Sequence, residues 1–512
     1  MPEKFFKKLN KSILPQWKVC FIAALVVGLL AHLYKITGWL PNWDSLVFRY
    51  DAQNMLSIGR WFLPVACSFS SFYDLPFLNG ILAIILHAVS AVVVCKIFGV
   101  RKKITAALLG AVIVSFPTVT SVLMYNYVAD GYSISFLLAT LAALYMTRQK
   151  PNYIISALCI TLSVAIYQAY LTVTIMLVLF KLIDEAIFGE QPILKKAGLM
   201  LLSGAAGMVL YSVALKIILA ATSTELLDYQ GASTVSLSSI DIPRSLYVIK
   251  ETFLNYFFDT SGGISVFVCI NVLVFLVAIG YYAGYVIKNK IYKKPLNLLI
   301  VILLSAMLPI GATVLALINA GVDYHNLMLM GYSVFYVIFI LLYERGSEGK
   351  EKLVATKRWI VLVLSVTLIA SHIVIANVSY HKAQMAYEKS YGTLIRITDR
   401  IEQTENGETA QNIVVIGALE DSEAYSATLP PEITGVTDGH IIRADDEIVG
   451  QSVFCSTIND YCGKDYKFLA GEEKKAYCNL KEVKAMGVWP NNDSVKKIDD
   501  TIIVKLGEED EK

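Results

Sequence analysis

Residues 77–98 read FLNGILAIILHAVSAVVVCKIF, and Lys96 is the only Lys, Arg, Asp or Glu among them. An α-helix rises about 1.5 Å per residue, so about 20 apolar residues cross the roughly 30 Å hydrocarbon core of a bilayer. The stretch therefore predicts a membrane-spanning helix. The whole chain is 56% hydrophobic and only 17% charged, which is too apolar for a soluble protein and indicates several such helices.

Comparable apolar runs recur along the first three quarters of the chain, and the fifth and sixth of them are short. We predict a polytopic α-helical membrane protein with about eleven transmembrane helices. The predicted spans lie near 18–34, 77–98, 104–123, 131–147, 153–166, 169–183, 197–220, 264–287, 296–318, 327–343 and 359–377.

Clusters of Lys and Arg occupy every second connection between these runs. By the positive-inside rule they face the cytoplasm together with the N-terminus, and the alternating connections lie outside. With an odd number of spans the C-terminal part also lies outside, whereas an even number would invert it. The basic clusters are 101–103, Arg148 with Lys150, Lys195 with Lys196, 288–294 and 345–358, and the predicted outer loops are about 35–75, 124–131, 221–263 and 319–326.

The charge balance changes sign late in the chain. Residues 1–378 hold 29 Lys and Arg against 17 Asp and Glu, while residues 379–512 hold 15 against 25. We therefore expect a transmembrane domain over 1–378 and a separate extracytoplasmic domain over 379–512. A helical pattern over 383–403, followed by β-like runs at 412–417 and 499–506, predicts a small α/β or α+β fold.

Cysteine placement gives one further expectation for this C-terminal domain. Outside the cytoplasm, Cys455 and Cys462 could close a small disulfide loop, which would leave Cys478 unpaired.

The first outer loop carries an amphipathic pattern that suits a helix lying in the membrane interface. Asp44 in this loop could act as a general base toward an acceptor hydroxyl, or be a solvated residue or a helix N-cap. Arg49 and Arg60 could hold a phosphate, or pair with lipid head groups and nearby Asp side chains. Asp130, in the second outer loop, could close over the same cavity as Asp44 or cap a helix.

Two short polar motifs lie at other predicted outer turns. In 323–326, DYHN, Asp323 is a candidate for binding sugar or acceptor, and His325 could donate to a phosphate or be an ordinary exposed histidine. In 167–170, YQAY, the side chains of Tyr167, Gln168 and Tyr170 could line a sugar site or form an interfacial aromatic belt.

The sequence lacks the common cofactor motifs. It has no GxxxxGK[ST], no GxGxxG before a strand, no HExxH and no Cys/His metal spacing. We therefore expect no nucleotide or redox cofactor and no resident metal site, although a divalent cation could bind where carboxylates and phosphates meet.

Several segments together resemble one family. NWDSLVFRY (42–50), SIGRWFLP (57–64) and DLPFLNGILAIILHAVSAVVVCKIF (74–98) resemble the start of the Gtr-type glucosyl transferases, which belong to the GT-C superfamily and are known from O-antigen glucosylation. YNYVADGYSISFLLATLAALY (125–145) looks like the second outer loop of that family, and IYQAYLTVTIMLVL (166–179) looks like its next helical pair. VWPNNDSVKKIDDTIIVKL (488–506) is similar to the tail of Gram-positive relatives.

The resemblance implies a GT-C-like fold in the bacterial cytoplasmic membrane. It implies transfer of a sugar, glucose by the family name, from a polyprenyl-phosphate donor to a surface or lipid-linked glycan on the outer side. Asp44 matches the usual catalytic base, Asp130 matches the second-loop acid and Arg60 matches the GRW signature. Relatives commonly offer an Arg or Lys to the donor phosphate from a late outer loop, where this chain has His325.

Two other classes of protein fit a polytopic chain with few motifs. A flippase or transporter for lipid-linked oligosaccharide predicts charges at mid-membrane and inverted repeats, and neither stands out in the sequence. A non-catalytic surface-assembly protein should tolerate Asp44→Asn, whereas an enzyme that uses this base should not.

Overall fold

The computed structural model describes residues 2–3, 13–48, 53–189, 193–227, 241–261, 263–345, 351–405, 407–419, 425, 428–437, 439–440 and 447–508. The chain divides into two compact units. The first contains Met1–Gly38, Tyr50–Asn377 and Pro430–Val436, and the second contains Trp39–Arg49, Val378–Leu429 and Thr437–Lys512. Each unit is described by itself.

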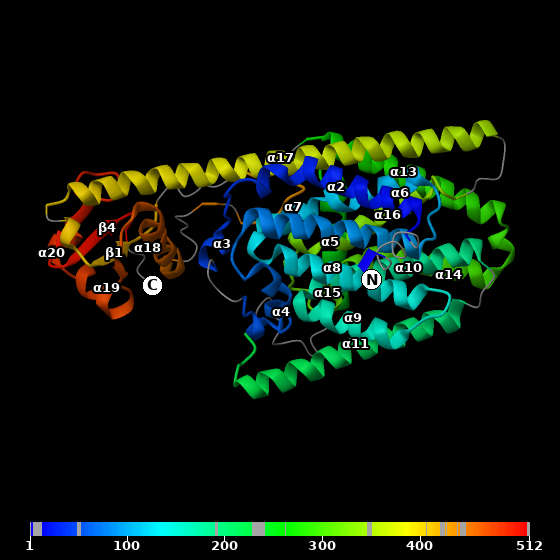
Figure 1. Cartoon of the computed structure of the whole chain (residues 1–512), viewed down its shortest axis with the longest axis horizontal. Coiled ribbons are helices and arrows are strands. Elements are labelled where there is room, and N and C mark those ends of the chain that lie inside the picture. The colour runs from blue at the N-terminus through cyan, green and yellow to red at the C-terminus, as the bar shows by residue number, and fades with distance from the viewer. Residues whose placement is uncertain are drawn as a thin grey trace. The chain divides into compact units, whose positions relative to one another are not determined.

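Helices that pack side by side build the first unit (Figure 1). α2 packs against α5 and α6, α8 contacts α5, α9 and α10, α11 packs on α9, and α14 packs on α10. The helices are α2 (Pro15–Ile36), α4 (Leu63–Cys67), α5 (Pro76–Ile97), α6 (Lys103–Ser115), α7 (Pro117–Met124), α8 (Ala129–Thr147), α9 (Tyr153–Ile166), α10 (Leu171–Phe188), α11 (Ile193–Thr222), α12 (Ile242–Phe258), α13 (Val266–Lys288), α14 (Pro295–Ala312), α15 (Leu315–Ile318) and α16 (Ser333–Leu341). α17 (Glu351–Gln403) contributes residues to both units.

Several of these helices are long and apolar enough to cross a bilayer, so the chain is a multi-pass membrane protein. Among the described residues seven helices meet this criterion by length and composition, or eight if the bent pair α6 and α7 forms one span. Each predicted apolar run coincides with helical structure, but several of the helices, such as α9, are shorter than a full span. The count of about eleven spans stays a prediction.

The sequence explains two local features of the bundle. α6 and α7 meet at an angle of 41°, because Phe116 is extended and Pro117 begins α7 without a backbone N–H to continue the α6 ladder. α2 and α6 approach closely at Gly110, where an added Cβ would collide with the carbonyl oxygen of Cys20. A side chain at position 110 would therefore separate the two helices.

The expected interfacial helix in the first loop is not formed, and this prediction is wrong. The described part of the segment contains only short pieces, among them α3 (Trp43–Val47), the 3-10 turn η1 (Leu56–Ile58) and α4. Leu46 of α3 is buried in the core of the second unit, whereas the residues from Leu56 onward belong to the first unit. The apolar positions that read as one helical stripe thus pack against different partners.

The second unit contains a four-stranded mixed sheet in the order β2-β1-β4-β3. β1 is parallel to both of its neighbours, and β4 is antiparallel to β3. The strands are β1 (Asn412–Ile416), β2 (Lys467–Phe468), β3 (Val495–Ile498) and β4 (Thr501–Lys505), and the helices between β1 and β3 are α18 (Glu447–Cys462), α19 (Gly471–Cys478) and α20 (Lys481–Lys484).

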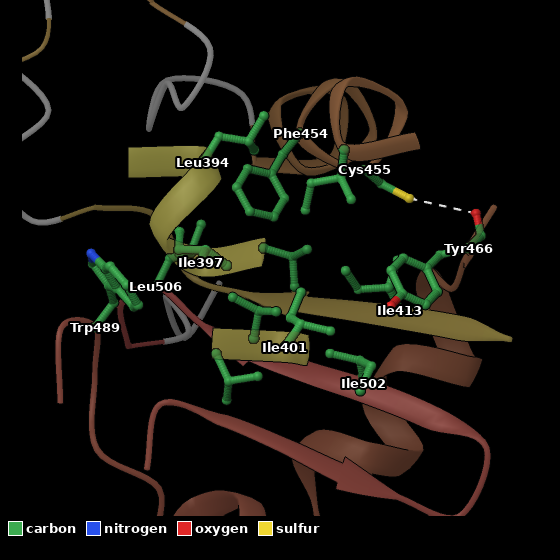
Figure 2. Packing of buried hydrophobic residues seen from close by; sticks show 14 of the residues in the cluster. Leu394, Ile397, Ile401, Ile413, Phe454, Cys455, Tyr466, Trp489, Ile502 and Leu506 are labelled. Atoms are coloured by element: carbon green, nitrogen blue, oxygen red, sulfur yellow. Dashed lines mark hydrogen bonds between the residues drawn. The ribbon is translucent and has the colours of Figure 1, made fainter. Parts of the chain in front are cut away.

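The central strands are buried on both faces, because alternate side chains point to opposite sides of a sheet. Ile413 and Ile502, paired in register, face α17 and α18, where Leu394, Phe454 and other residues complete the larger core cluster (Figure 2). The alternate side chains of β1 and β4 face a second cluster formed with α19 and α20. Its buried members are Val414, Ile416, Leu469, Val483, Met486 and Ile503.

The disulfide considered between Cys455 and Cys462 is not formed. Both residues lie on α18 seven positions apart, which corresponds to a rise of about 10 Å, too far for a disulfide. The thiol of Cys455 instead points toward the carbonyl oxygen of Tyr466, 3.7 Å away (Figure 2). Burial raises the pKa of this thiol to about 12.

Candidate functional site

Asp44 lies in the first turn of α3, within the second unit. It is not the N-cap, because the side chain of Asn42 takes that role by accepting a hydrogen bond of 2.8 Å from the backbone N–H of Ser45. The carboxylate Oδ2 of Asp44 accepts a hydrogen bond of 2.6 Å from the hydroxyl of Thr437, which also accepts one from the Asn42 amide at 3.0 Å. Asp44 is half-buried, so its carboxylate is held in place without being enclosed.

The packing of α3 explains this orientation. Leu46 is 3% exposed in the core of the second unit, and Trp43 and Val47 pack against the same core. These residues lie three or four positions apart, or next to each other, on one face of the short helix. The packing of this face holds α3 in place. The orientation of Asp44 therefore depends on residues more than 300 positions later in the chain.

Arg60 is the centre of a second set of residues, which we call the Arg60 cluster: Arg60, Tyr132, Tyr167 and Gln168. The Nη1 of Arg60 donates a hydrogen bond of 2.7 Å to the Tyr132 hydroxyl. Its guanidinium lies over the Tyr167 ring, 4.7 Å from the centroid, and the rings of Tyr132 and Tyr167 stack at 4.5 Å. The hydrogen bond and the two rings restrain a side chain that would otherwise be flexible.

The backbone before Arg60 is pinned to the junction between α9 and α10. Gly59 adopts a left-handed conformation with φ of 82°, which favours glycine, and ends the turn η1. The amide of Gln168 donates to the carbonyl of Ile58 at 3.0 Å, and the hydroxyl of Tyr211 donates to the carbonyl of Gly59 at 3.0 Å. Arg60, Tyr167 and Gln168, predicted from two separate motifs, are thus brought together.

His325 lies close enough to Arg60 for the positive charge of the guanidinium to affect the pKa of the imidazole. Burial, and then the positive charge of Arg60, lower the pKa of His325 below its usual value of 6.5, whereas Asp323 acts in the opposite direction. The imidazole is therefore neutral at pH 7, and its buried Nδ1 has no hydrogen-bond partner among the described residues. Asp323 is exposed.

A segment of the chain far from the loop covers His325. Gly435 lies against the His325 side chain, and the backbone N–H of Asn326 donates to the carbonyl of Thr434 at 2.9 Å. The same segment contains Glu432, which is 8% exposed. Burial raises the pKa of its carboxyl group. No sequence pattern predicts this contact, because residues 430–436 lie more than 100 positions after His325 in the chain.

Asp130 belongs to a different polar set, the Asp130 cluster: Ser70, Asp74, Asn79, Asn126 and Asp130. Asp130 is 1% exposed, and neither carboxylate oxygen has a hydrogen-bond partner among the described residues, although Ser70 and Asn79 lie beside it. The Asn126 amide donates to Asp74 at 2.6 Å. Unpartnered buried carboxylates are costly and therefore typical of functional positions.

The two clusters use different faces of α8. Asp130 and Tyr132 are two positions apart, which corresponds to a rotation of about 200° around a helix. Asp130 therefore points toward the region of α4 and α5, and Tyr132 points toward Arg60 and Tyr167. Asp130 caps no helix, since the residue that precedes α8 is Val128.

No sequence pattern singled out Tyr132, Tyr211, Asp74 or the buried Lys35, whose charge interacts with Asp74. A hydropathy pattern does not distinguish these residues from their neighbours, because each lies within or next to an apolar run. The ring of Tyr170, 1% exposed, contacts Phe136 and Tyr167 and lies in the helix packing.

Two further observations concern Arg49 and a possible metal ion. Arg49 lies outside the described residues. Among the residues that the structure describes, no group of three His, Cys, Asp or Glu side chains could hold a metal ion.

Comparison with known families adds one finding. A family model described as glucosyl transferase GtrII matches residues 33–343. No curated protein and no solved structure matches the chain. The matched range includes Asp44, the Arg60 cluster, Asp130 and His325, and it ends before α17.

Proposed function

The chain belongs to the glucosyl transferase GtrII family, and we propose that it transfers glucose from a polyprenyl-phosphate donor with inversion of the anomeric centre. As a member of this family with several apolar helices, it is a membrane glycosyltransferase. The donor, the acceptor and the roles of individual residues below are part of the proposal.

The arrangement of Arg60 is the observation that carries the proposal. The Arg60 guanidinium, hydrogen-bonded to the Tyr132 hydroxyl and lying over the Tyr167 ring, presents a planar, permanently charged donor whose geometry suits phosphate oxygens. Neutral His325 adds a neighbouring N–H donor without adding charge. We assign both side chains to the donor phosphate, together with Arg49 from the same loop.

Asp44 is assigned as the general base. The acceptor oxygen attacks the anomeric carbon, and Asp44 takes the proton from that hydroxyl as the bond between the anomeric carbon and the phosphate oxygen breaks. The bonding electrons leave with the polyprenyl phosphate, whose added negative charge Arg60 offsets. The Thr437 hydroxyl orients the Asp44 carboxylate for this role.

The remaining predicted residues are assigned to the sugar and the acceptor. Asp130 is kept apart from these residues as a second catalytic carboxylate, because a buried carboxylate without a described hydrogen-bond partner is typical of functional positions. Tyr167 and Gln168 line the sugar site beside Arg60, while Tyr170 supports Tyr167 and Asp323 meets the acceptor.

The location of the reaction follows from the distribution of basic residues. We place it on the outer side of the bacterial cytoplasmic membrane, with the N-terminus inside and the C-terminal unit outside. The acceptor is then a cell-surface or lipid-linked glycan, and neither a redox cofactor nor a nucleotide takes part.

The test is donor consumption by the full chain purified in detergent. Polyprenyl-phosphate glucose, galactose and N-acetylglucosamine are offered separately, with a nucleotide-linked glucose as a fourth donor and cell-envelope extract as acceptor. We expect turnover of the glucose lipid and none of the nucleotide sugar. Turnover of the nucleotide sugar, or of no donor, would contradict the proposal and favour a transport or assembly role.

A further inference from the structure

A large basic cavity lies in the first unit among the ends of several helices. Its volume is 1410 Å³, and it lies among the C-terminal ends of α5, α8 and α10 and the N-terminal end of α11. None of the residues assigned above to glucosyl transfer lines it. Its charged lining residues are Lys96, Arg101, Lys102, Arg148, Lys181, Lys195, Lys196 and Arg345, with Asp184, Glu185 and Glu344.

The three acids are already engaged by part of this basic set. Arg345 binds Asp184 at 2.6 Å, and Lys196 binds Glu185 at 2.6 Å. Lys102 lies 3.9 Å from Glu344, whose carboxylate also accepts hydrogen bonds from the backbone N–H groups of residues 101 and 102. These contacts stabilise the helix ends and account for the acids as structural partners.

Four cations remain without a described acid within ion-pair distance: Lys96, Arg101, Arg148 and Lys195. All four are exposed. Lys96 lies over the ring of Trp17 and Arg148 over that of Tyr145, so neither partner neutralises the charge. The described lining thus carries more positive charge than its own carboxylates offset, and the excess suits an anion.

The surroundings of the cavity favour a lipid as the source of that anion. Tyr153 and Leu199 line it, and the helices that carry them, α9 and α11, expose large apolar side chains. Ile154 is 76% exposed and Leu202 is 66% exposed, so in a bilayer these helices contact acyl chains. Basic pockets between membrane helices on the cytoplasmic side are suited to anionic head groups.

We propose that this cavity binds the phosphate head group of an anionic phospholipid, whose acyl chains lie along α9 and α11. The exposed cations Arg148 and Lys195 contact the phosphate, while the pairs formed by Arg345 and Lys196 keep the cavity open. The site is separate from glucosyl transfer and sits where the positive-inside rule places the cytoplasm.

Native mass spectrometry of the full chain tests this binding site. The protein is titrated with phosphatidylglycerol and with phosphatidylcholine of the same acyl chains, and retained lipid is counted. The test variant is Arg148→Gln with Lys195→Gln. The control is Lys103→Gln with Lys150→Gln, which removes the same charge from exposed positions nearby that do not line the cavity. Thermal unfolding confirms that both variants fold.

We expect the wild type to prefer phosphatidylglycerol, the test variant to bind it about tenfold more weakly, and the control to stay within about twofold of the wild type. Equal loss in both variants, or no preference for the anionic lipid, would overturn the proposal. Inorganic pyrophosphate serves as a soluble anion. If pyrophosphate raises the melting temperature of the protein as much as phosphatidylglycerol does, the assignment to a lipid is wrong.

Discussion

Arg60 and Tyr132 are joined by a hydrogen bond of 2.7 Å between the guanidinium Nη1 and the phenol oxygen, across 72 positions of sequence. The bond links the loop after α3 to α8, and the Tyr167 ring beneath the guanidinium adds the junction between α9 and α10 to the same contact. The cation that we assign to the donor phosphate is therefore positioned by three separate segments rather than by its own loop. If the assignment holds, we expect donor binding to depend on the geometry of Arg60 as well as on its charge.

Substitution of Arg60 separates geometry from charge. Arg60→Lys keeps the positive charge but loses the planar fork and the stacking on Tyr167, so we expect kcat/KM for the lipid donor to fall about tenfold. Arg60→Ala removes the charge as well and should lower it about 100-fold. Steady-state donor consumption measures both variants, and equal rates for Arg60→Lys and the wild type would show that stacking is unimportant.

His325 makes stability depend on pH in a defined direction. Its pKa is lower in the folded protein than the usual 6.5, so below that pH the unfolded chain binds more protons at this side chain. Stability is therefore complete above about pH 6.5 and is lost as the pH falls through the lowered pKa. His325→Asn should lose less thermal stability than the wild type between pH 7.5 and 5.5.

The comparison between the two proteins isolates this side chain, because the other histidines are unchanged in the variant. Identical changes in melting temperature for the wild type and His325→Asn would show that His325 is not the group responsible.

Phe454 tests the core of the second unit. It is 1% exposed and packs with Leu394 and Ile413 between α17, α18 and the sheet (Figure 2). Phe454→Ala should reduce the stability of this unit by about 3–5 kcal/mol through lost burial and an unfilled cavity. Limited proteolysis should cleave residues 412–506 faster in the variant, and an unchanged cleavage rate would contradict the packing described.

The partly buried Ser456, two positions further along α18, provides a matched substitution. Ser456→Ala should cost far less, because it removes one hydroxyl and leaves no large cavity.

The sequence predicted what depends on local pattern. The apolar run at 77–98 became α5, over Pro76–Ile97, and the β-like run at 412–417 became β1, over Asn412–Ile416. Each element is decided by residues within one short window, where hydropathy and periodicity suffice.

Long-range packing explains what the sequence could not supply. The amphipathic pattern of the first outer loop does not form one helix, because Leu46 packs in a core with Leu394, Phe454 and Ile502. Only the folded chain brings these residues together. The role of Tyr132 could not be predicted, because an aromatic residue in an apolar helix is ordinarily part of the core. Its contact with Arg60, 72 positions away in the sequence, is visible only in the folded structure.

The catalytic role of Asp44 is the central claim, and Asp44→Asn tests it most directly. An Asn side chain can still accept the hydrogen bond from Thr437, so α3 keeps its place while the base is lost. Glu225→Gln, at an exposed acid of another predicted outer loop, is the matched control, and Asp130→Asn is measured beside it.

Initial rates of donor consumption by purified full-length proteins decide the outcome. We predict that Asp44→Asn lowers kcat at least about 100-fold, as the loss of a general base requires, while Glu225→Gln matches the wild type. Wild-type kcat in Asp44→Asn would contradict the account, and a large loss in Asp130→Asn alone would place the base on α8 instead.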